Sequence, residues 1–300
     1  IFQDVGQDSF KLIPNSPIAY WLSTNLIKTF SKFGCLKEKF ESKNGITSAD
    51  NDRFLRYWHE VAFDSCCFDS ENRDSAKLSH KKWFPHNKGG GYKKWLGNND
   101  YVINWENDGK EIFDFRPKST VRNPNYFFRP QVSWSDVVTG NLSFRYYPAG
   151  FGFDAAANSA FSENKEKLYA LLALCNTKVI TYLGPVFNPS MHFKLGDFGA
   201  LPAILRSDKD LVSDVDRMID ICAEDLALFE ENYEFIGPDY SGEFIKQSYE
   251  TYTRLSNART KELMVLEEKN NKLTIELASL EGDFDFGVDF EDVSLISNRH

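Results

Sequence analysis

The chain has 300 residues, of which 42% are hydrophobic and 26% are charged. This balance is typical of a globular protein with a sizeable core, and it excludes disordered, collagenous and fibrous classes. The longest apolar run, residues 169–175, is far shorter than the roughly 20 residues that a membrane helix needs. We therefore predict no membrane partner.

The cysteines and the N-terminal residues indicate the cellular compartment of the protein. The five cysteines include no CxxC pair and no spacing typical of a zinc site, which favours a reducing, cytoplasmic compartment. The segment Ile1–Asp4 has no initiator Met, no basic region and no apolar signal core. These features favour a piece of a longer polypeptide over an exported protein.

In chain order, the first predicted element is a helix from Ser16 to about Gly34, where a capping hydroxyl precedes a proline and apolar residues follow at helical spacing. From Asn99 to Asp154, aromatic and β-branched clusters alternate with turn sequences, which predicts a twisted, mostly antiparallel sheet. Residues 54–61, 164–183 and 208–234 are predicted to be helical.

The last long segment, from Glu243 to Leu280, has a regular seam. Its positions are Ile245, Tyr249, Tyr252, Ser256, Arg259, Leu263, Leu266, Asn270, Leu273, Leu277 and Leu280. Alternate spacings of four and three predict a coiled-coil helix, in which the polar Asn270 would set register and partner. Either the 208–234 helix, the rest of this chain or another protein could cover the seam.

Together these elements predict an α+β fold. It would comprise an N-terminal helix, a mostly antiparallel β region and a C-terminal long-helix or coiled-coil region. The expected boundaries are a helical connector at 1–40, a β-rich domain at 41–203 and an acidic helical scaffold at 204–300.

Charge is unevenly distributed along the chain. The net charge is −9, but residues 1–201 hold 25 Lys and Arg against 21 Asp and Glu, whereas residues 202–300 hold 10 against 23. Within residues 77–99 six lysines and no acidic residue alternate with aromatic residues. Such a stretch is typical either of a phosphate-facing surface or of a solvated lysine-rich loop whose aromatics pack on the core.

Catalytic motifs are absent. The sequence contains no GxSxG, GxxxxGK[ST] or HExxH motif and no Cys/His cluster. Lys88-Gly89-Gly90-Gly91 has its lysine before the glycines, which predicts a flexible turn. Asn123-Pro124-Asn125-Tyr126 is similar to the Asn-Pro-Pro-Tyr motif of amino-methyltransferases, but no methyl-donor motif precedes it, so a turn between strands is expected. We predict no catalytic residue, cofactor or metal site in this chain.

Four blocks, in this order, carry a family resemblance: residues 45–61, 82–90, 94–109 and 143–148. They resemble the target-recognition region of large adenine methyltransferases, above all the PglX type of BREX phage defence, and more distantly the MmeI-type and TaqI-like enzymes. Residues 171–178 resemble the helix that closes this region. In residues 45–61, Ser48-Ala49 replaces the usual Thr-Gly.

The resemblance implies that residues 41–203 form a target-recognition domain and that this chain lacks the catalytic domain. The parent enzyme would transfer a methyl group from S-adenosylmethionine to the N6 of adenine. Implied partners are double-stranded DNA, other phage-defence proteins bound through the helical region, and a phage-encoded acidic DNA mimic that acts as an inhibitor.

Two residue sets follow from how proteins recognise DNA. Lysines neutralise phosphates without fixed geometry, and the candidates are Lys81, Lys82, Lys88, Lys93, Lys94 and Lys118. Arg and Asn form bidentate contacts with guanine and adenine, and the candidates are Asn51, Arg53, Asn87, Arg122 and Arg145. Asn51 and Arg53 have a structural alternative, since either can fix the turn before the next helix.

Two other functions compete with DNA recognition. The chain could be a protein-interaction module whose helices dock other defence components while its basic patch is incidental. A self-contained enzyme is disfavoured by the missing motifs.

Overall fold

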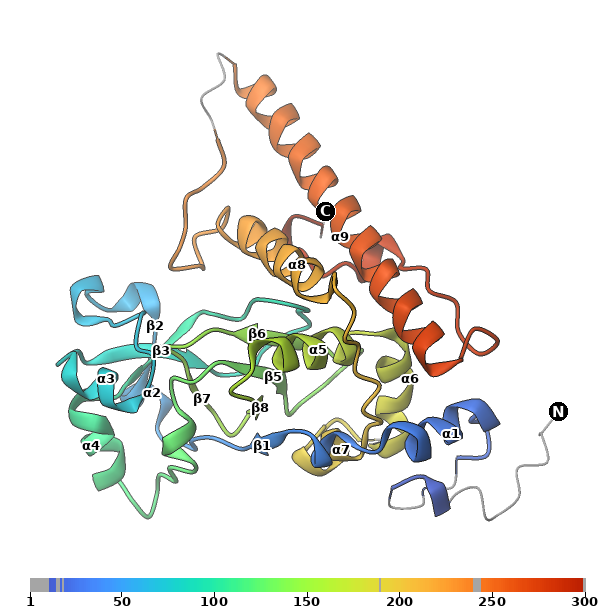
Figure 1. Ribbon diagram of the computed structural model, residues 1–300. Coiled ribbons are helices and arrows are strands. Elements are labelled where there is room, and N and C mark those ends of the chain that lie inside the picture. The colour runs from blue at the N-terminus through green and yellow to red at the C-terminus, as the bar shows by residue number, and fades with distance from the viewer. Residues whose placement is uncertain (1–10, 15–16, 18, 189, 240–243, 299–300) are drawn as a thin grey trace.

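The computed structural model describes residues 11–14, 17, 19–188, 190–239 and 244–298, and its α+β fold confirms the prediction (Figure 1). The described helices are α1 (Thr24–Phe33), α2 (Asn51–Phe54), α3 (Arg73–Leu78), α4 (Glu106–Asp114), α5 (Lys165–Cys175), α6 (Lys178–Phe187), α7 (Leu195–Ala200), α8 (Leu211–Leu226) and α9 (Ile245–Ala278). The described strands are β1 (Glu41–Lys43), β2 (Leu55–Tyr57), β3 (Trp83–Asn87), β4 (Tyr101–Asn104), β5 (Gln131–Ser135), β6 (Phe144–Tyr147), β7 (Gly152–Phe153) and β8 (Ala157–Phe161).

The strands form two sheets of four strands each. One has the order β1-β8-β5-β6 and is antiparallel throughout; the other has the order β2-β4-β3-β7, in which only the β3–β7 pair is parallel. The predicted, mostly antiparallel β region is therefore confirmed. Since β3 and β7 are far apart in sequence, this pair brings the ends of two distant segments to one place.

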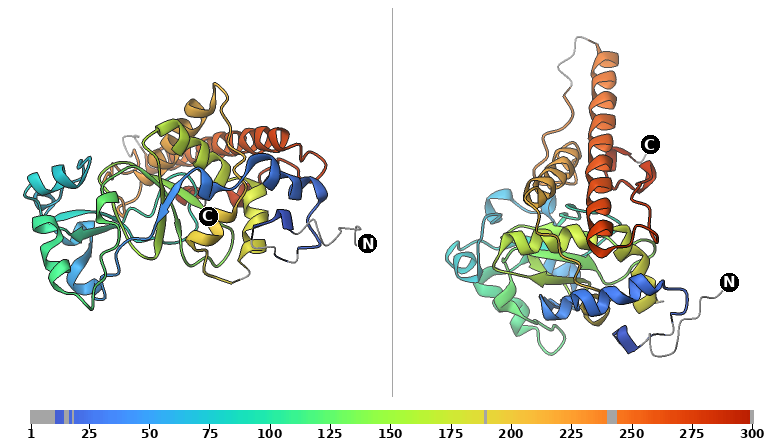
Figure 2. Two further views of the ribbon diagram at one scale, coloured as in Figure 1. Left: turned by 60° about the horizontal axis from the view of Figure 1, so that its bottom comes forward. Right: turned by 45° about the vertical axis from the view of Figure 1, so that its right-hand side comes forward.

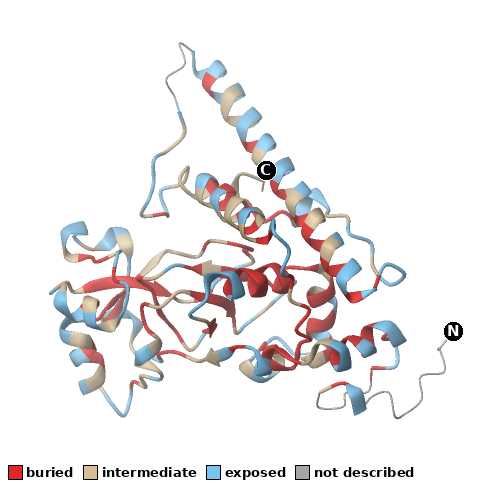
Figure 3. Ribbon diagram, viewed as in Figure 1, coloured by how far each residue is buried: buried red, intermediate tan, exposed pale blue. Residues whose placement is uncertain are grey.

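The largest hydrophobic core surrounds α5. All residues from Leu168 to Cys175 are buried, because α5 lies between the β5–β6 sheet and helices α6, α8 and α9. This core also includes Leu26 of α1, Trp134 of β5 and Leu263 of α9. A second, aromatic-rich core lies under the β2-β4-β3-β7 sheet and includes Trp105. Figure 3 shows this buried interior of the sheets.

Helix boundaries depart from the prediction in several places. The first described helix, α1, begins after Ser23, which caps it, whereas the predicted start at Ser16 lies outside the described residues. The 164–183 helix is two helices, α5 and α6, and the 208–234 helix is shortened to α8. No single described helix is long and apolar enough to cross a membrane. Helices α5 and α6 together have the required length and composition, but the chain bends by 75° between them.

The helix expected at residues 54–61 is wrong. The α-helix α2 ends at Phe54, and the chain then becomes β2, because residues 55–57 pair with β4; a single 3₁₀ turn follows at Trp58–Glu60. β-sheet pairing outweighs local helical spacing here, a usual outcome when tertiary partners are present.

The long C-terminal helix is confirmed as α9, but the heptad seam matches its buried face only in part: Ser256, Leu263 and Asn270 are buried, and the other seam positions within α9 are not. Ile245 and Tyr249 are 89% and 66% exposed, and the N-terminal half of the helix projects from the rest of the protein (Figures 1 and 2). The buried positions of α9 are Ser248, Ser256, Thr260, Leu263, Glu267, Asn270, Asn271, Thr274, Ile275 and Ala278. A straight helix on a globular body follows its own 3.6-residue period, not the 3.5-residue period of a supercoil.

Asn270 finds its partners within this chain. Its Oδ1 accepts a hydrogen bond from Arg206 Nη1 at 2.8 Å, and its Nδ2 donates to the carbonyl of Ala173 in α5 at 2.8 Å. The polar seam residue therefore fixes the docking of α9 onto α5 and onto the segment before α8.

Candidate nucleic-acid interface

Two predicted base-reading residues are buried structural groups. Arg145 in β6 is fully buried, and its guanidinium contacts Ser135 Oγ at 3.0 Å. Asn87 at the end of β3 is also fully buried, where it donates to Ser133 Oγ at 2.7 Å and accepts from the amide of Gly89 at 3.1 Å. Neither side chain can reach a base edge in this conformation, so we correct both assignments.

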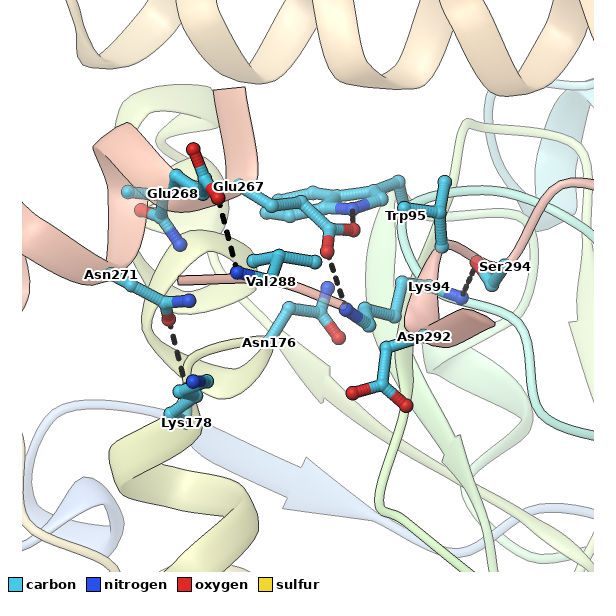
Figure 4. A network of polar contacts seen from close by, with 12 residues as sticks. Lys94, Trp95, Asn176, Lys178, Glu267, Glu268, Asn271, Val288, Asp292 and Ser294 are labelled. Atoms are coloured by element: carbon cyan, nitrogen blue, oxygen red, sulfur yellow. Dashed lines mark hydrogen bonds and ion pairs between the residues drawn. The ribbon is translucent and has the colours of Figure 1, made fainter. Parts of the chain in front are cut away.

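Two predicted phosphate contacts are also buried. The Lys94 ammonium lies 2.5 Å from Glu267 Oε2 of α9, and Glu267 Oε1 accepts a hydrogen bond from the Trp95 indole at 2.7 Å (Figure 4). Burial by itself would lower the pKa of Lys94, but Glu267 outweighs this effect and raises it. Lys93 donates to the carbonyl of Ser294 at 3.2 Å. Both lysines hold the C-terminal region onto the β region, and both phosphate assignments are corrected.

Five of the remaining candidates lie on or beside two adjacent segments. Asn51 and Arg53 are exposed in residues 44–53, Lys118 and Arg122 are exposed in residues 115–123, and the partly buried Lys88 reaches Asn51. We call these two segments, together with Lys88, the polar edge.

Close backbone packing positions the first segment of the polar edge. A Cβ at Gly45 would lie 1.9 Å from the carbonyl oxygen of Phe153, a distance no side chain tolerates. The absence of a side chain lets the Ile46 amide bond that same carbonyl at 3.0 Å. Asp50 then caps α2 by accepting from the Arg53 amide at 3.1 Å.

The second segment is tied to the first by main-chain hydrogen bonds. The amides of Thr47 and Thr120 donate to each other's carbonyls at 2.9 and 2.8 Å. Asn123, which has a left-handed backbone, donates from Nδ2 to the carbonyl of Asn44 at 2.8 Å. Where a turn between strands was expected, Pro124–Tyr126 forms one 3₁₀ turn between α4 and β5, and the two segments form one ordered surface.

Arg122 is the best-placed base-reading candidate on the polar edge. It is exposed, and its Nη1 makes only long contacts of 3.4 Å with Asn44 Oδ1 and Thr47 Oγ1. It has no ion-pair partner among the residues that the structure describes. Its donors are therefore oriented but largely available to a ligand.

Arg53 and Lys118 flank one aromatic ring. The Arg53 guanidinium carbon lies 5.0 Å from the ring centre of Phe115, and Lys118 Nζ lies 5.4 Å from it. Arg53 is also paired with Glu111 at 2.7 Å, and this pairing is the main reason why the pKa of Glu111 is lowered. Lys118 is exposed and has no ion pair in the described part of the chain. Lys118 is thus the freer cation.

The contacts of Asn51 favour a structural role over base reading. Its Oδ1 accepts from Ser48 Oγ at 2.6 Å and from Lys88 Nζ at 3.4 Å. A bidentate contact with adenine needs that oxygen as an acceptor, so binding would have to displace one of these donors.

Lys81 and Lys82 lie beside Trp83 and not on the polar edge. Lys82 Nζ lies 5.5 Å from the Trp83 ring, and Arg56 approaches the same ring at 6.0 Å. Lys81 donates to the carbonyl of Asp64. Both lysines are half-buried, and Trp83 and Trp95 are buried, which favours the alternative in which the aromatic residues of this stretch pack on the core.

A buried carboxylate holds Lys88. Asp154 Oδ2 lies 2.9 Å from Lys88 Nζ and 3.6 Å from Nε2 of the fully buried His86. Burial would raise the pKa of Asp154, but the contacts with His86 and Lys88 outweigh it and lower that pKa. Burial also lowers the pKa of His86, against an opposing effect of Asp154. Lys88 therefore brings less net positive charge to the polar edge than its sequence position suggests.

Replacing Asp154 by Asn is expected to lower the free energy of unfolding at pH 7 by about 1–3 kcal/mol, because Lys88 loses its charged acceptor. A carboxyl whose folded pKa lies below its ordinary value of 3.8 stabilises the fold above that pH, and the effect disappears as pH falls through the folded pKa. Urea unfolding of the native chain and the variant should therefore differ at pH 7, and the difference should shrink as the pH falls below 3.8 and through the folded pKa of Asp154. A difference that persists unchanged at low pH would contradict this role.

Sequence reasoning missed the residues that organise the polar edge. Asn44 bonds Ala155, Asn158, Asn123 and Arg122, through both its side chain and its carbonyl. The available signal was its place directly before Gly45, where the first resembling block begins. A single Asn before a Gly is typical of many turns, so it did not stand out.

Two known proteins match almost the whole chain. Adenine-specific methyltransferase BrxX of Escherichia coli O9:H4 (strain HS) is 34% identical over 282 residues, which is 92% of this chain and 22% of that protein. Adenine-specific methyltransferase PglX of Lacticaseibacillus casei (strain Zhang) is 31% identical over 305 residues, 96% of this chain and 25% of that protein. No protein-family model matches the chain. The chain thus spans about a quarter of these relatives' length, and the similarity fits a PglX-like family of the BREX type.

Proposed function

We propose that this chain recognises double-stranded DNA for an adenine-specific methyltransferase of BREX phage defence. The catalytic domain, which would use S-adenosylmethionine, would lie in the rest of such an enzyme. The observation that carries the proposal is the polar edge, where Arg122 and Lys118 are exposed, free of ion pairs among the described residues and held on hydrogen-bonded segments. Similarity to two adenine-specific methyltransferases supports it.

The two cations would serve different purposes. Lys118 carries a point charge on a flexible stem, which suits a phosphate. The Arg122 fork, steadied by Asn44 and Thr47, suits the O6 and N7 atoms of guanine in the major groove. The acidic region at residues 202–300 would repel phosphates and would support the β region instead.

The test is binding of this chain to duplex DNA at several salt concentrations, first with a randomised pool to identify the preferred site. Lys118→Ala should weaken binding to all sequences and reduce the slope of log K against log salt by about one. Arg122→Ala should cost about 1–3 kcal/mol on the preferred site and relax sequence choice at one position.

Arg122→Lys and Lys28→Ala serve as matched controls. The first keeps the charge but loses the bidentate fork, so sequence choice should relax while the salt slope stays. The second removes an exposed lysine from α1, away from the polar edge, and should change little. Binding that depends on none of these residues, or no salt-dependent binding at all, would refute the proposal.

A second function has one specific observation in its favour. The projecting end of α9 exposes Ile245 and Tyr249, whose side chains no described residue covers well. This would suit docking of another phage-defence protein. Ile245→Ser together with Tyr249→Ser should then abolish capture of such a partner without changing DNA affinity, whereas unchanged capture would exclude this docking surface.

A further inference from the structure

Arg145 is a buried cation without an anionic partner. Its side chain is fully buried, it makes no ion pair among the described residues, and its Nε has no hydrogen-bond acceptor. Its other nitrogens contact neutral oxygens: Ser135 Oγ at 3.0 Å, and Ser143 Oγ and the Lys93 carbonyl at 3.4 Å. A buried charge is costly unless it is paired, so this arrangement leaves positive potential without compensation.

A small cavity adjoins this cation. It has a volume of 120 Å³, and Ser135 and Ser143, the two hydroxyls that Arg145 contacts, both line it. The rest of the lining comes from the glycine-rich turn at Gly90 and Gly91, from Tyr92, and from residues 137–141. The volume suffices for several water molecules or for one tetrahedral oxyanion.

The lining offers hydrogen-bond donors. The hydroxyl of Ser143 accepts from the Lys93 amide and from Arg145, and its own proton has no acceptor among the described residues. Ser135 is fully engaged, because it accepts from the amide of Gly90 and donates to the carbonyl of Gly90. This holds the glycine-rich turn in place over β5.

Two glycines that line the cavity have open space around them. A Cβ at Gly91 or Gly140 would meet no atom within 4 Å, and the φ angles of both lie outside the left-handed region. Substitutions there are therefore tolerated by the fold. Lys88, at the start of the same turn, reaches Asn51 on the polar edge, so the cavity and the edge share one segment.

We propose that this cavity binds a phosphate group, attracted by the uncompensated charge of Arg145 and bound by the hydroxyl of Ser143 and the turn at Gly91. Such concave arrangements of donors in glycine-rich turns suit anions. The phosphate would be one of the DNA backbone, and this part of the inference rests on the proposed function; a free phosphate has the same chemistry.

Inorganic phosphate is the first probe, titrated calorimetrically into the whole chain. Gly91→Glu places a carboxylate beside the cavity and should weaken phosphate binding at least tenfold, whereas the neutral isostere Gly91→Gln should stay within about twofold. Gly196→Glu adds the same charge at an exposed glycine of α7 with open space around it, and should also change little. Ser143→Ala should weaken binding without adding charge.

Duplex DNA is the second probe. If the phosphate belongs to the DNA backbone, Gly91→Glu should weaken DNA binding relative to Gly91→Gln and Gly196→Glu, and should reduce the salt slope by about one. If phosphate binds, and DNA either does not bind or binds with an affinity that does not respond to Gly91→Glu, the cavity is a site for a free phosphate. The Lys118→Ala and Arg122→Ala variants then test the proposed function independently of the cavity.

One combination overturns the inference. It is the absence of saturable phosphate binding together with either no DNA binding or equal DNA binding by Gly91→Glu and Gly91→Gln. Thermal unfolding of each variant shows whether the fold is intact. Loss of binding that results from unfolding is thereby distinguished from loss of the binding site itself.

Discussion

Glu267→Ala is expected to lower the free energy of unfolding by about 3–5 kcal/mol, because it leaves the buried Lys94 ammonium without a counter-charge. The ammonium lies 2.5 Å from Glu267, and the same carboxylate also accepts from the Trp95 indole. Removing one side chain therefore breaks two buried contacts between α9 and the β region (Figure 4). Chemical denaturation monitored by tryptophan fluorescence measures this loss.

Glu250→Ala is the matched control for Glu267. Glu250 lies on the same helix, its side chain is 62% exposed, and it faces Lys246 one turn away. Exposed pairs of this kind contribute about 0.5 kcal/mol or less. Replacing Lys94 and Glu267 together by Met and Leu should recover much of the stability, since no buried charge remains. If the single and double variants lost the same stability, the ion pair would not be the cause.

Gly45→Ala is expected to destabilise the fold by about 3 kcal/mol or more and to weaken DNA binding. The new Cβ would lie 1.9 Å from the carbonyl of Phe153, so the backbone must move and the Ile46 hydrogen bond to that carbonyl is strained. Because Asn44 and Thr47 orient Arg122, this movement also displaces the polar edge. Denaturation and DNA titration of the same variant report the two effects.

Gly282→Ala distinguishes close packing from glycine flexibility. Its Cβ would meet no atom within 4 Å, so stability should change by no more than about 1 kcal/mol. A large effect at Gly282, or a negligible one at Gly45, would contradict the packing argument.

Several features of this protein follow from the sequence alone. The turn-punctuated aromatic clusters predicted an antiparallel β region, and the periodic C-terminal segment predicted one long helix; both are confirmed, because hydrophobic period and turn residues are local signals. The family resemblance was also readable, because it rests on contiguous blocks of residues, and the two methyltransferase relatives fit it.

Only the tertiary structure decided which charged residues are available. Lys94 and Lys118 are equally basic in sequence, yet Glu267, 173 positions beyond Lys94, buries and neutralises the first, while the second stays exposed beside Phe115. Arg145 and Arg122 differ in burial alone: Arg145 lies in β6, where residues on both faces of the strand are buried, whereas Arg122 lies exposed on a hydrogen-bonded loop. Burial and ion pairing depend on residues distant in sequence, and no local pattern encodes them.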